Sequence, residues 1–375
     1  MAPSALSNLP IPSLHSKGKA ATESAAKYPK PLQLSGALDK FPYEETTPVI
    51  GREYLKVNIV DDLLSATNAD ELLRDLAITI SKRGVVFFRA QTNLTDELQK
   101  NFVQRLGQLT GKPSTSTLHI HPVLNNTSEF GVQDAEISTI SSQARNSIFK
   151  FTKTKGRRYD AALWHSDIQF ERNPADYTSL RLTQLPPTGG DTLWASGYEL
   201  YDRFSKPYQR LFEGLTARFV GDGFLRAAAE NPDRVHIYTE ARGSPNNVGG
   251  ELAAVHPVVR TNPVTGWKSI YALGPFPKAI NELTEAESDE LLRKFLTTIL
   301  ENHDLQVRFK WRNEHDIGLA YFPAIWDNRS VFHSATFDYD GLGDRFGHRA
   351  VGIAEEPYLD PNSKSRSEAL AEEKS

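Results

Sequence analysis

Two histidines and one carboxylate in this 375-residue chain are of the types that hold a catalytic metal ion. His165 and Asp167 stand two residues apart, so in an extended segment both side chains point to the same side. A more distant histidine, His333, could complete a facial set of two imidazoles and one carboxylate. Such a set leaves three positions open on iron(II), as O₂ activation with a bidentate co-substrate requires. The alternative is a chance His-x-Asp pair and an ordinary buried histidine, since the chain has 10 histidines.

A hydroxyl and two arginines could hold anionic groups. Thr192 follows the pair Gly189-Gly190, which is typical of a tight turn that enters a strand, and its hydroxyl could donate to a carboxylate. Arg345 and Arg349 follow His333, and a guanidinium binds a carboxylate through two parallel hydrogen bonds. The alternative for these arginines is a solvated basic turn among nearby aspartates.

The order of these residues is more specific than any one of them. His-x-Asp, then Thr, His and Arg at these intervals resembles the 2-oxoglutarate oxygenases of the taurine dioxygenase family. The resemblance covers about residues 50–358 and is most detailed over three stretches, 164–196, 256–261 and 326–349.

The resemblance implies a role for each of these residues. His165, Asp167 and His333 are expected to bind Fe(II), and Thr192 with Arg345 to hold the distal carboxylate of 2-oxoglutarate. The implied activity is that of a 2-oxoglutarate-dependent dioxygenase, which uses O₂ and releases succinate and CO₂. No catalytic residue is expected beyond the metal centre.

The same resemblance implies a pocket for a small anionic substrate. His121, Phe276 and Arg349 match substrate-contacting positions of the family, and Ile168 is expected beside them. Two donors such as His121 and Arg349 favour an anion, because its lost hydration must be offset by charged hydrogen bonds. Arg349 could instead pair with Asp340 or Asp344 and have a structural role.

The expected substrate differs from taurine. Leu124 and Ala161 stand where taurine dioxygenase has polar side chains near the substrate amine, so taurine itself is not expected. Extra residues between Gly318 and Ile325 and one before Arg345 also set the chain apart from the bacterial enzyme, and it is more similar to fungal sulfonate and alkyl-sulfate oxygenases. An alkyl sulfonate or sulfate ester is therefore expected, and its hydroxylated product collapses to an aldehyde and sulfite or sulfate. Two alternatives stay open: the same chemistry on a carboxylate or secondary metabolite, and a non-catalytic small-molecule binder.

Hydrophobic spacing predicts the elements that position these residues. Apolar residues at helical spacing predict a helix over 72–80, with Gly84 as its C-terminal cap, and a second helix over 98–106 that ends at Gly107. A buried strand is expected over 85–88. Thr284 and Glu287 form a capping box for a third helix that reaches residue 299. Alternation over 307–311 predicts a half-buried strand.

Short strands with glycine and proline between them predict a mainly β fold with helices. We expect a double-stranded β-helix (jelly-roll, cupin-like) core decorated by α-helices, with one open mouth for a ligand. The catalytic domain is expected over 46–360. Residues 1–45 and 361–375 are rich in small and polar residues and are expected to be a disordered arm and tail.

Composition excludes several classes of site and partner. The chain has no cysteine, which excludes disulfides, thiolate nucleophiles and cysteine-bound metals. Its net charge is -4, with acidic and basic residues mixed, so no nucleic-acid partner is expected. No apolar run is long enough for a membrane span, and no signal-peptide core is present. A cytoplasmic enzyme is expected, alone or as a homo-oligomer, with O₂ and a small anion as its partners.

Overall fold

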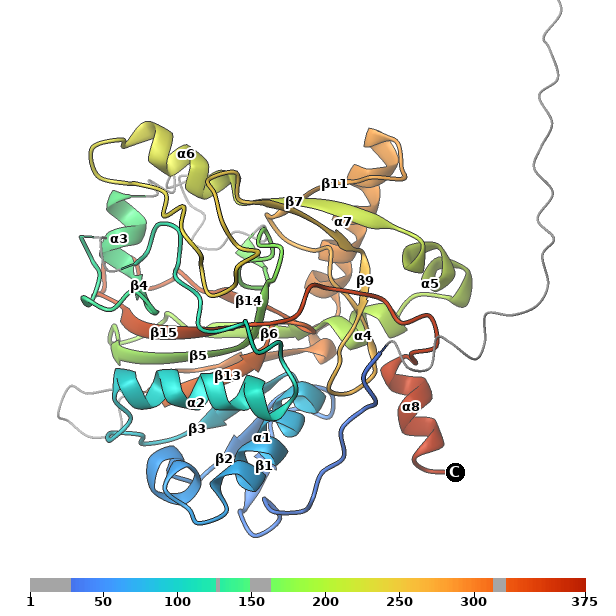
Figure 1. Cartoon of the computed structure of the whole chain (residues 1–375), viewed down its shortest axis with the longest axis horizontal. Coiled ribbons are helices and arrows are strands. Elements are labelled where there is room, and N and C mark those ends of the chain that lie inside the picture. The colour runs from blue at the N-terminus through green and yellow to red at the C-terminus, as the bar shows by residue number, and fades with distance from the viewer. Residues whose placement is uncertain (1–27, 126–128, 149–162, 313–321) are drawn as a thin grey trace, which may run out of the picture.

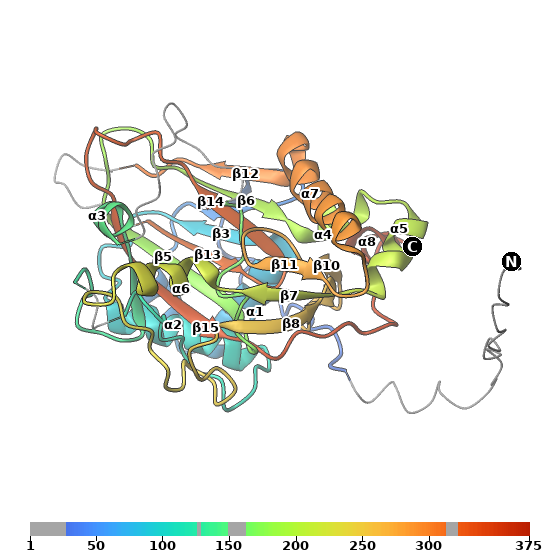
Figure 2. The ribbon, with the colours of Figure 1, turned by 90° about the horizontal axis from the view of Figure 1, so that it is seen from above.

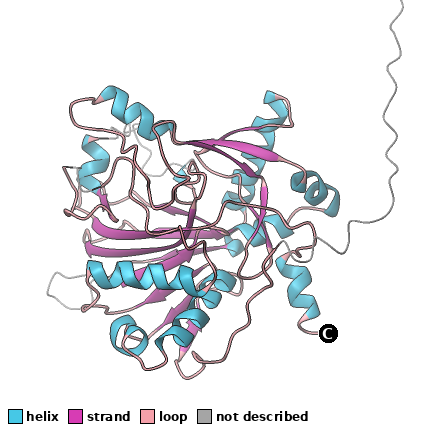
Figure 3. Cartoon of the chain, in the orientation of Figure 1, coloured by secondary structure: helices cyan, strands magenta, loops and turns pink. Residues whose placement is uncertain are grey.

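The computed structural model describes residues 28–125, 129–148, 163–312 and 322–375 (Figures 1 and 3). Its helices are η2 Ile59–Leu64, α1 Ala69–Arg83, α2 Asp96–Leu109, α3 Ser142–Ser147, α4 Gly197–Asp202, α5 Lys206–Glu213, α6 Asp222–Glu230, α7 Glu285–Glu301, η4 His303–Leu305 and α8 Arg366–Glu372. Its strands are β1 Tyr43–Glu45, β2 Arg52–Tyr54, β3 Val85–Phe88, β4 Ile137–Ser141, β5 Ala175–Gln184, β6 Thr192–Ser196, β7 Thr216–Val220, β8 Ala253–Pro257, β9 Val259–Thr261, β10 Lys268–Ile270, β11 Pro277–Ile280, β12 Gln306–Phe309, β13 Phe322–Asp327, β14 Val331–Ala335 and β15 Phe346–Ile353.

A seven-stranded sheet in the order β1-β2-β3-β13-β5-β15-β4 forms the centre of the molecule. Only the β2–β3 pair within it is parallel. Successive side chains of a strand point to opposite faces, and the buried strand β3 shows this directly. Val86 and Phe88 join the hydrophobic cluster that contains α1 and α2, whereas Val85 and Phe87 join a second cluster on the other face.

The second cluster joins the large sheet to a smaller sheet in the order β12-β6-β14. It is built largely from aromatic rings of both sheets, including Phe87, Trp194, Phe309 and Trp326. Two sheets therefore face each other across an apolar layer, while α1 and α2 cover the outer face of the large sheet (Figure 1). The sheet-rich fold with helices is as expected; its description as a double-stranded β-helix stays a prediction.

The remaining strands form a three-stranded sheet, β11-β7-β8, and the pair β10-β9. Helix α7 packs beside β11 through Leu291, Phe295 and Ile299, on the far side of the molecule from α3 (Figure 2). Helix α6 follows β7 and lies on the side of the large sheet away from α1 and α2 (Figures 1 and 2). Within the described ranges, no helix combines the length and the apolar character that crossing a membrane requires.

Most of the elements expected from hydrophobic spacing are confirmed. Helix α1 ends at its C-cap Gly84, and α7 begins with the capping box of Thr284 and Glu287. The predicted end of the second helix at Gly107 is wrong, because α2 continues to Leu109. A Cβ atom at Gly107 would lie 2.4 Å from Oδ2 of Asp176, so this glycine permits a close approach rather than ending the helix. Strand β12 ends at Phe309, short of the expected residue 311.

Both ends of the chain contain ordered parts where disorder was expected. In the expected arm, residues 28–45 run along the molecule from beside α8 to β1 (Figure 1). In the expected tail, Ser365 caps α8 with Glu368 in a capping box. The composition of these segments suggested disorder. The contacts that stabilise them could not be foreseen, because Asp75 for the arm and Asp202 for the tail lie far away in the sequence.

Asp75 anchors the N-terminal segment. Its buried carboxylate accepts hydrogen bonds from the backbone N–H groups of Ser35, Gly36 and Ala37 and from the Ser35 hydroxyl. Hydrogen bonds to a charged group contribute about 1.5–3 kcal/mol each, and neighbouring ones are not additive. We predict that Asp75→Ala lowers the free energy of unfolding by about 2–3 kcal/mol, measured by urea denaturation.

The same substitution should expose residues 28–45 to limited proteolysis. The control is Asp70→Ala, which lies on α1 like Asp75 and removes an exposed partner of Arg105 on α2; it should change the stability by less than about 1 kcal/mol. Equal stability and equal cleavage for the two variants would contradict the anchoring role of Asp75.

Candidate active site

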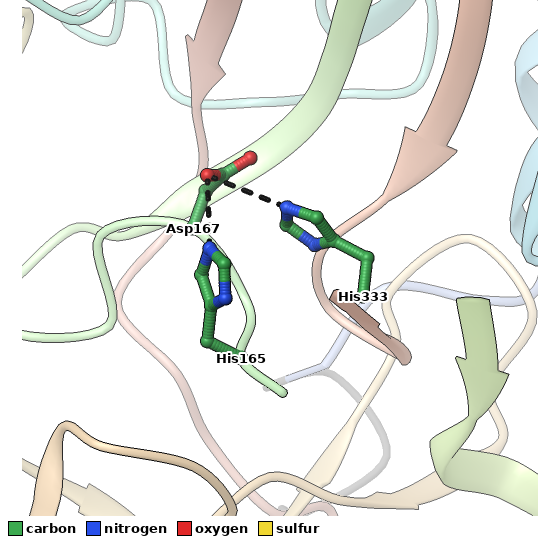
Figure 4. Close-up of side chains that lie close together, drawn as sticks. All are labelled: His165, Asp167 and His333. Atoms are coloured by element: carbon green, nitrogen blue, oxygen red, sulfur yellow. Dashed lines mark ion pairs between the residues drawn. The ribbon is translucent and has the colours of Figure 1, made fainter. Parts of the chain in front are cut away.

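The side chains of His165, Asp167 and His333 lie together (Figure 4). Oδ1 of Asp167 is 3.9 Å from Nε2 of His165 and 3.9 Å from Nε2 of His333. Two ligand atoms that each lie about 2.1 Å from one metal can be separated by at most about 4.2 Å. Each histidine–aspartate pair is therefore already close enough to share a metal ion. Among the described residues, no other group of three or more His, Asp or Glu side chains has this geometry.

Backbone hydrogen bonds bring the two histidines together. The His165 N–H donates to the His333 carbonyl at 3.0 Å, and the His333 N–H donates to the His165 carbonyl at 2.8 Å. His333 belongs to β14, whereas His165 lies in an isolated bridge rather than in a regular strand. The extended segment expected around His165 and Asp167 is thus limited to the single β-bridge between His165 and His333. The chain turns immediately after Asp167, where Ile168 has a φ of 49°.

Both imidazoles are in the neutral form that binds metals. Nδ1 of His165 lies 2.7 Å from the Leu163 carbonyl, so Nδ1 carries the proton and Nε2 has a free lone pair. Burial lowers the pKa of His165. Burial, with a contribution from His165, lowers the pKa of His333 to about 3. Neutral histidines with one carboxylate suit a divalent cation.

Asp167 is ionised and firmly held. Burial opposes its charge, but the adjacent Arg349 guanidinium keeps the pKa of Asp167 below its usual value. Arg349 Nη1 donates to Oδ1 at 2.6 Å, and the Thr178 hydroxyl donates to Oδ2 at 3.1 Å. The backbone N–H of Asp167 donates to Oδ1 of Asn328 at 3.0 Å.

The buried amide of Asn328 connects this aspartate to the large sheet. Its Oδ1 also accepts from Trp326 Nε1 at 3.0 Å, and its Nδ2 donates to the Asp176 carbonyl and the Thr178 hydroxyl at 3.0 and 2.8 Å. The Asn328 side chain therefore fixes the segment that presents Asp167.

Thr192 and Arg345 form a second part of the site. Arg345 Nη2 donates to the Thr192 hydroxyl at 3.2 Å, and Nε donates to the Gly190 carbonyl at 3.1 Å. Burial lowers the pKa of Arg345 to about 10. Within the described parts of the chain Arg345 makes no ion pair, and a buried unpaired guanidinium is costly. A carboxylate of a bound molecule would offset that cost.

The glycine turn allows Arg345 to reach Thr192. Gly190 has a φ of 73°, and a Cβ atom there would lie 3.2 Å from Cδ of Arg345. Thr192 and Trp194 are two residues apart on β6, and Trp194 pairs with His333 on β14. Thr192 is therefore on the same face as His333, about two residue steps, or roughly 7 Å, further along the small sheet.

A cavity of about 710 Å³ opens beside His165. It is lined by apolar side chains on several sides, by His121 and Arg349, and by charged residues of α6. The lining residues are His121, Leu124, Ile140, Leu163, His165, Asp222, Gly223, Phe224, Arg226, Ala227, Glu230, Pro275, Phe276 and Arg349.

His121 has one defined tautomer in this cavity. Its Nδ1 accepts from the backbone N–H groups of Val123 and Leu124 at 3.0 and 2.8 Å, so the proton of the neutral ring is on Nε2. Burial, and then the charge of Arg349, lowers the pKa of His121 well below 6.5. His121 is thus a neutral hydrogen-bond donor.

The expected substrate residues do not all lie in the cavity. His121, Leu124, Phe276 and Arg349 line it, whereas Ile168 packs in the hydrophobic core with Trp164 and Phe170. The positive φ of Ile168 reverses the chain after Asp167 and sends this side chain into the core. Ala161 lies outside the described residues.

Arg349 has partners other than the two aspartates considered as alternatives. It contacts Asp167 and the Ser138 hydroxyl, while Asp340 pairs with Arg145 and Asp344 accepts from Ser142. Arg349 is 8% exposed. It therefore connects the metal-ligand cluster to the cavity.

Sequence reasoning missed the helical wall of the cavity and the residues that support the ligands. Phe224 and Ala227 of α6 carry no motif, and their position depends on how α6 packs over the site. Asn328 lies in the stretch 326–349 that carries the family resemblance, five residues before His333, but its hydrogen-bond partners could not be read from the sequence.

A comparison with protein families identifies this arrangement. Residues 42–351 match the model described as "Taurine catabolism dioxygenase TauD, TfdA family". The chain belongs to this family. The matched residues include every residue of the candidate site and both facing sheets except the last two residues of β15.

Individual relatives agree with the family assignment. The alpha-ketoglutarate-dependent dioxygenase oryG of Aspergillus oryzae is 48% identical over 92% of this chain and 97% of its own length. An alpha-ketoglutarate-dependent sulfonate dioxygenase of Saccharomyces cerevisiae is 31% identical over 84% of this chain and 68% of its own. A taurine dioxygenase structure from Burkholderia xenovorans has a TM-score of 0.60 at 23% identity, covers 86% of this chain and 92% of its own, and shares the fold.

The chain is thus a 2-oxoglutarate-dependent dioxygenase, with Fe(II) as its metal and 2-oxoglutarate as its co-substrate. The residues present fit both groups. The His–Asp–His cluster offers three converging donor atoms, and buried Arg345 lacks a carboxylate partner among the described residues.

We predict that Asn328→Ala weakens metal binding about 10- to 100-fold, as is typical when a residue that orients a ligand is lost. It should also lower the free energy of unfolding by about 2 kcal/mol or more, because buried donors lose their acceptor. Calorimetric titration with Mn²⁺ and urea denaturation measure the two effects. Asn281→Ala, at an exposed amide, is the control, and equal Mn²⁺ affinities would contradict the role of Asn328.

We predict that Arg345→Ala raises the 2-oxoglutarate dissociation constant about 30-fold or more, because a buried carboxylate loses its charged partner. Thr192→Ala should raise it only about two- to tenfold, as expected for one neutral hydrogen bond. Arg308→Ala removes a half-exposed arginine that pairs with Asp191, and it should leave the constant unchanged. Unchanged affinity in Arg345→Ala would exclude Arg345 from the co-substrate site.

Proposed function

We propose that this dioxygenase hydroxylates a largely apolar organic anion, with alkyl sulfonates and sulfate esters as the first candidates. In this proposal His165, Asp167 and His333 bind Fe(II), and Thr192 with Arg345 bind the distal carboxylate of 2-oxoglutarate. The two facing sheets are then the double-stranded β-helix that carries these residues. The observation that supports the substrate class best is the cavity beside His165.

The protein's own contribution is to bind, orient and exclude water. The metal with 2-oxoglutarate and O₂ supplies the oxidising chemistry. Asn328 and Thr178 orient Asp167, and the Leu163 carbonyl fixes the tautomer of His165. The apolar walls keep the reacting carbon away from bulk water.

Two donors favour an anionic group at the inner end of the cavity. Nε and Nη1 of Arg349 have partners in Ser138 and Asp167, whereas its Nη2 makes no hydrogen bond within the described residues. The Nε2–H of neutral His121 is a second donor. Together they provide one charged and one neutral hydrogen bond, which can replace part of an anion's hydration.

The remainder of the cavity favours an apolar body. Leu124, Ile140, Leu163, Phe224 and Phe276 contribute aliphatic and aromatic walls. A volume of about 710 Å³ is within the usual range for drug-sized ligands, so a compound as small as taurine would leave most of it filled with water.

The relatives support two substrate classes. A sulfonate is supported by the name of the yeast relative, which is 31% identical. The second candidate is a carboxylate or secondary metabolite of similar shape. It is favoured by the cavity volume and by the 48% identity to a fungal dioxygenase whose name specifies no sulfonate.

Matched substrates test the anionic group. Succinate production should be faster with a medium-length alkyl sulfonate, sulfate ester or carboxylate than with the alcohol or amide of the same chain, and faster than with taurine. Equal turnover of charged and neutral members would contradict the anion pocket while leaving the dioxygenase assignment intact.

We predict that Arg349→Ala removes substrate-dependent succinate formation, because the anion loses its charged donor. Binding of 2-oxoglutarate should change little, which distinguishes Arg349 from Arg345. Since Arg349 also contacts Asp167, Mn²⁺ affinity is measured in parallel to detect damage to the metal site. Arg218→Ala, at an exposed arginine of β7 that does not line the cavity, is the control and should retain most activity.

A further inference from the structure

Trp311 donates a hydrogen bond to Thr192, the residue proposed above to bind the distal carboxylate of 2-oxoglutarate. Its Nε1 lies 3.0 Å from Oγ1 of Thr192, and the indole is 5% exposed. None of the chemical motifs contains this tryptophan. Its only expected role was as the last apolar position of a half-buried strand.

The geometry leaves the Thr192 hydroxyl able to make one further hydrogen bond, as a donor. A hydroxyl can accept two hydrogen bonds and donate one. Thr192 Oγ1 accepts from Trp311 Nε1 at 3.0 Å and from Arg345 Nη2 at 3.2 Å. Both lone pairs are therefore in use, and the O–H is free to donate to an acceptor.

Packing holds the indole in this position. Phe309, two residues earlier, pairs directly with Thr192 across β12 and β6. The Trp311 ring contacts Phe309 edge-on, with centroids 5.2 Å apart. These rings belong to the apolar cluster between the two facing sheets. The donor is thus fixed before any ligand binds.

We propose that Trp311 is a positioning residue for 2-oxoglutarate. By occupying a lone pair of Thr192 together with Arg345, it forces the hydroxyl to act as a donor toward the distal carboxylate. This inference rests on the proposed assignment of Thr192 and Arg345. The new element is that the protein makes the Thr192 hydroxyl a donor before the co-substrate binds.

The test uses Trp311→Phe, which removes the N–H and retains an aromatic ring. N-oxalylglycine, a 2-oxoglutarate analogue with the distal carboxylate, is titrated calorimetrically into the full-length protein loaded with Mn²⁺. We expect the dissociation constant to rise about two- to tenfold, the effect of one neutral hydrogen bond. With N-methyloxamate, which has the same chelating head and no distal carboxylate, the variant and the wild type should bind equally.

Trp194→Phe is the matched control. Trp194 lies in the same cluster, and its buried Nε1 has no hydrogen-bond partner among the described residues. Its substitution should leave the N-oxalylglycine affinity unchanged. In a Thr192→Val background, Trp311→Phe should have no further effect, because the hydroxyl through which it acts is absent.

Three outcomes would overturn the inference. They are an unchanged N-oxalylglycine affinity in Trp311→Phe, an equal loss of affinity for N-methyloxamate, and an additive effect in the Thr192→Val background. A general packing defect would produce the last two. If Arg345→Ala also bound N-oxalylglycine with unchanged affinity, the assignment of the co-substrate site itself would fail. If Arg345→Ala lost affinity as predicted, only the role of Trp311 would be wrong.

Discussion

The two backbone hydrogen bonds between His165 and His333 are the constraint on which the site depends. They join the described segment that begins at Leu163 to strand β14, and the two segments are far apart in the sequence. With this bridge formed, the imidazoles face the same carboxylate, and Asp167 needs only a local turn to reach them. The Asn328 amide then connects that turn to β13 and β5. The geometry of the ligands is therefore a property of the sheets, because each ligand is held by backbone or by a buried amide.

Buried charge is distributed unevenly around this bridge. Asp167 is the single anion of the ligand cluster and already contacts Arg349, whereas Arg345 has no carboxylate partner in the described structure. The histidines and His121 are neutral, since burial lowers each pKa. The site thus has excess positive charge at Arg345, where one carboxylate of 2-oxoglutarate is expected to bind. The negative charge of a bound carboxylate offsets the free-energy cost of burying the Arg345 guanidinium.

The sequence predicted the parts that depend on local patterns. Helix α7 and its capping box, strand β3 and the candidate ligands could be found because spacing and residue type carry their signal. Ile168 was misplaced because a positive φ at a β-branched residue has no local signature. The support of Asp167 by Asn328 and of Thr192 by Trp311 depends on strand pairing between distant segments, which one sequence does not reveal. The helix α8 was missed because its stabilising partners lie far from it in the sequence.

Helix α6 separates the choice of substrate from the chemistry. Phe224, Leu225 and Ala227 of this helix pack against the hydrophobic clusters, whereas four of its cavity residues are exposed, namely Asp222, Gly223, Arg226 and Glu230. The proposed metal ligands and co-substrate residues belong to other elements. Mutations at the four exposed positions can therefore accumulate without loss of iron or of the folded state, and each one changes the shape or charge of the cavity wall. A chain built in this way can diversify its substrates during evolution while its oxidative chemistry stays constant.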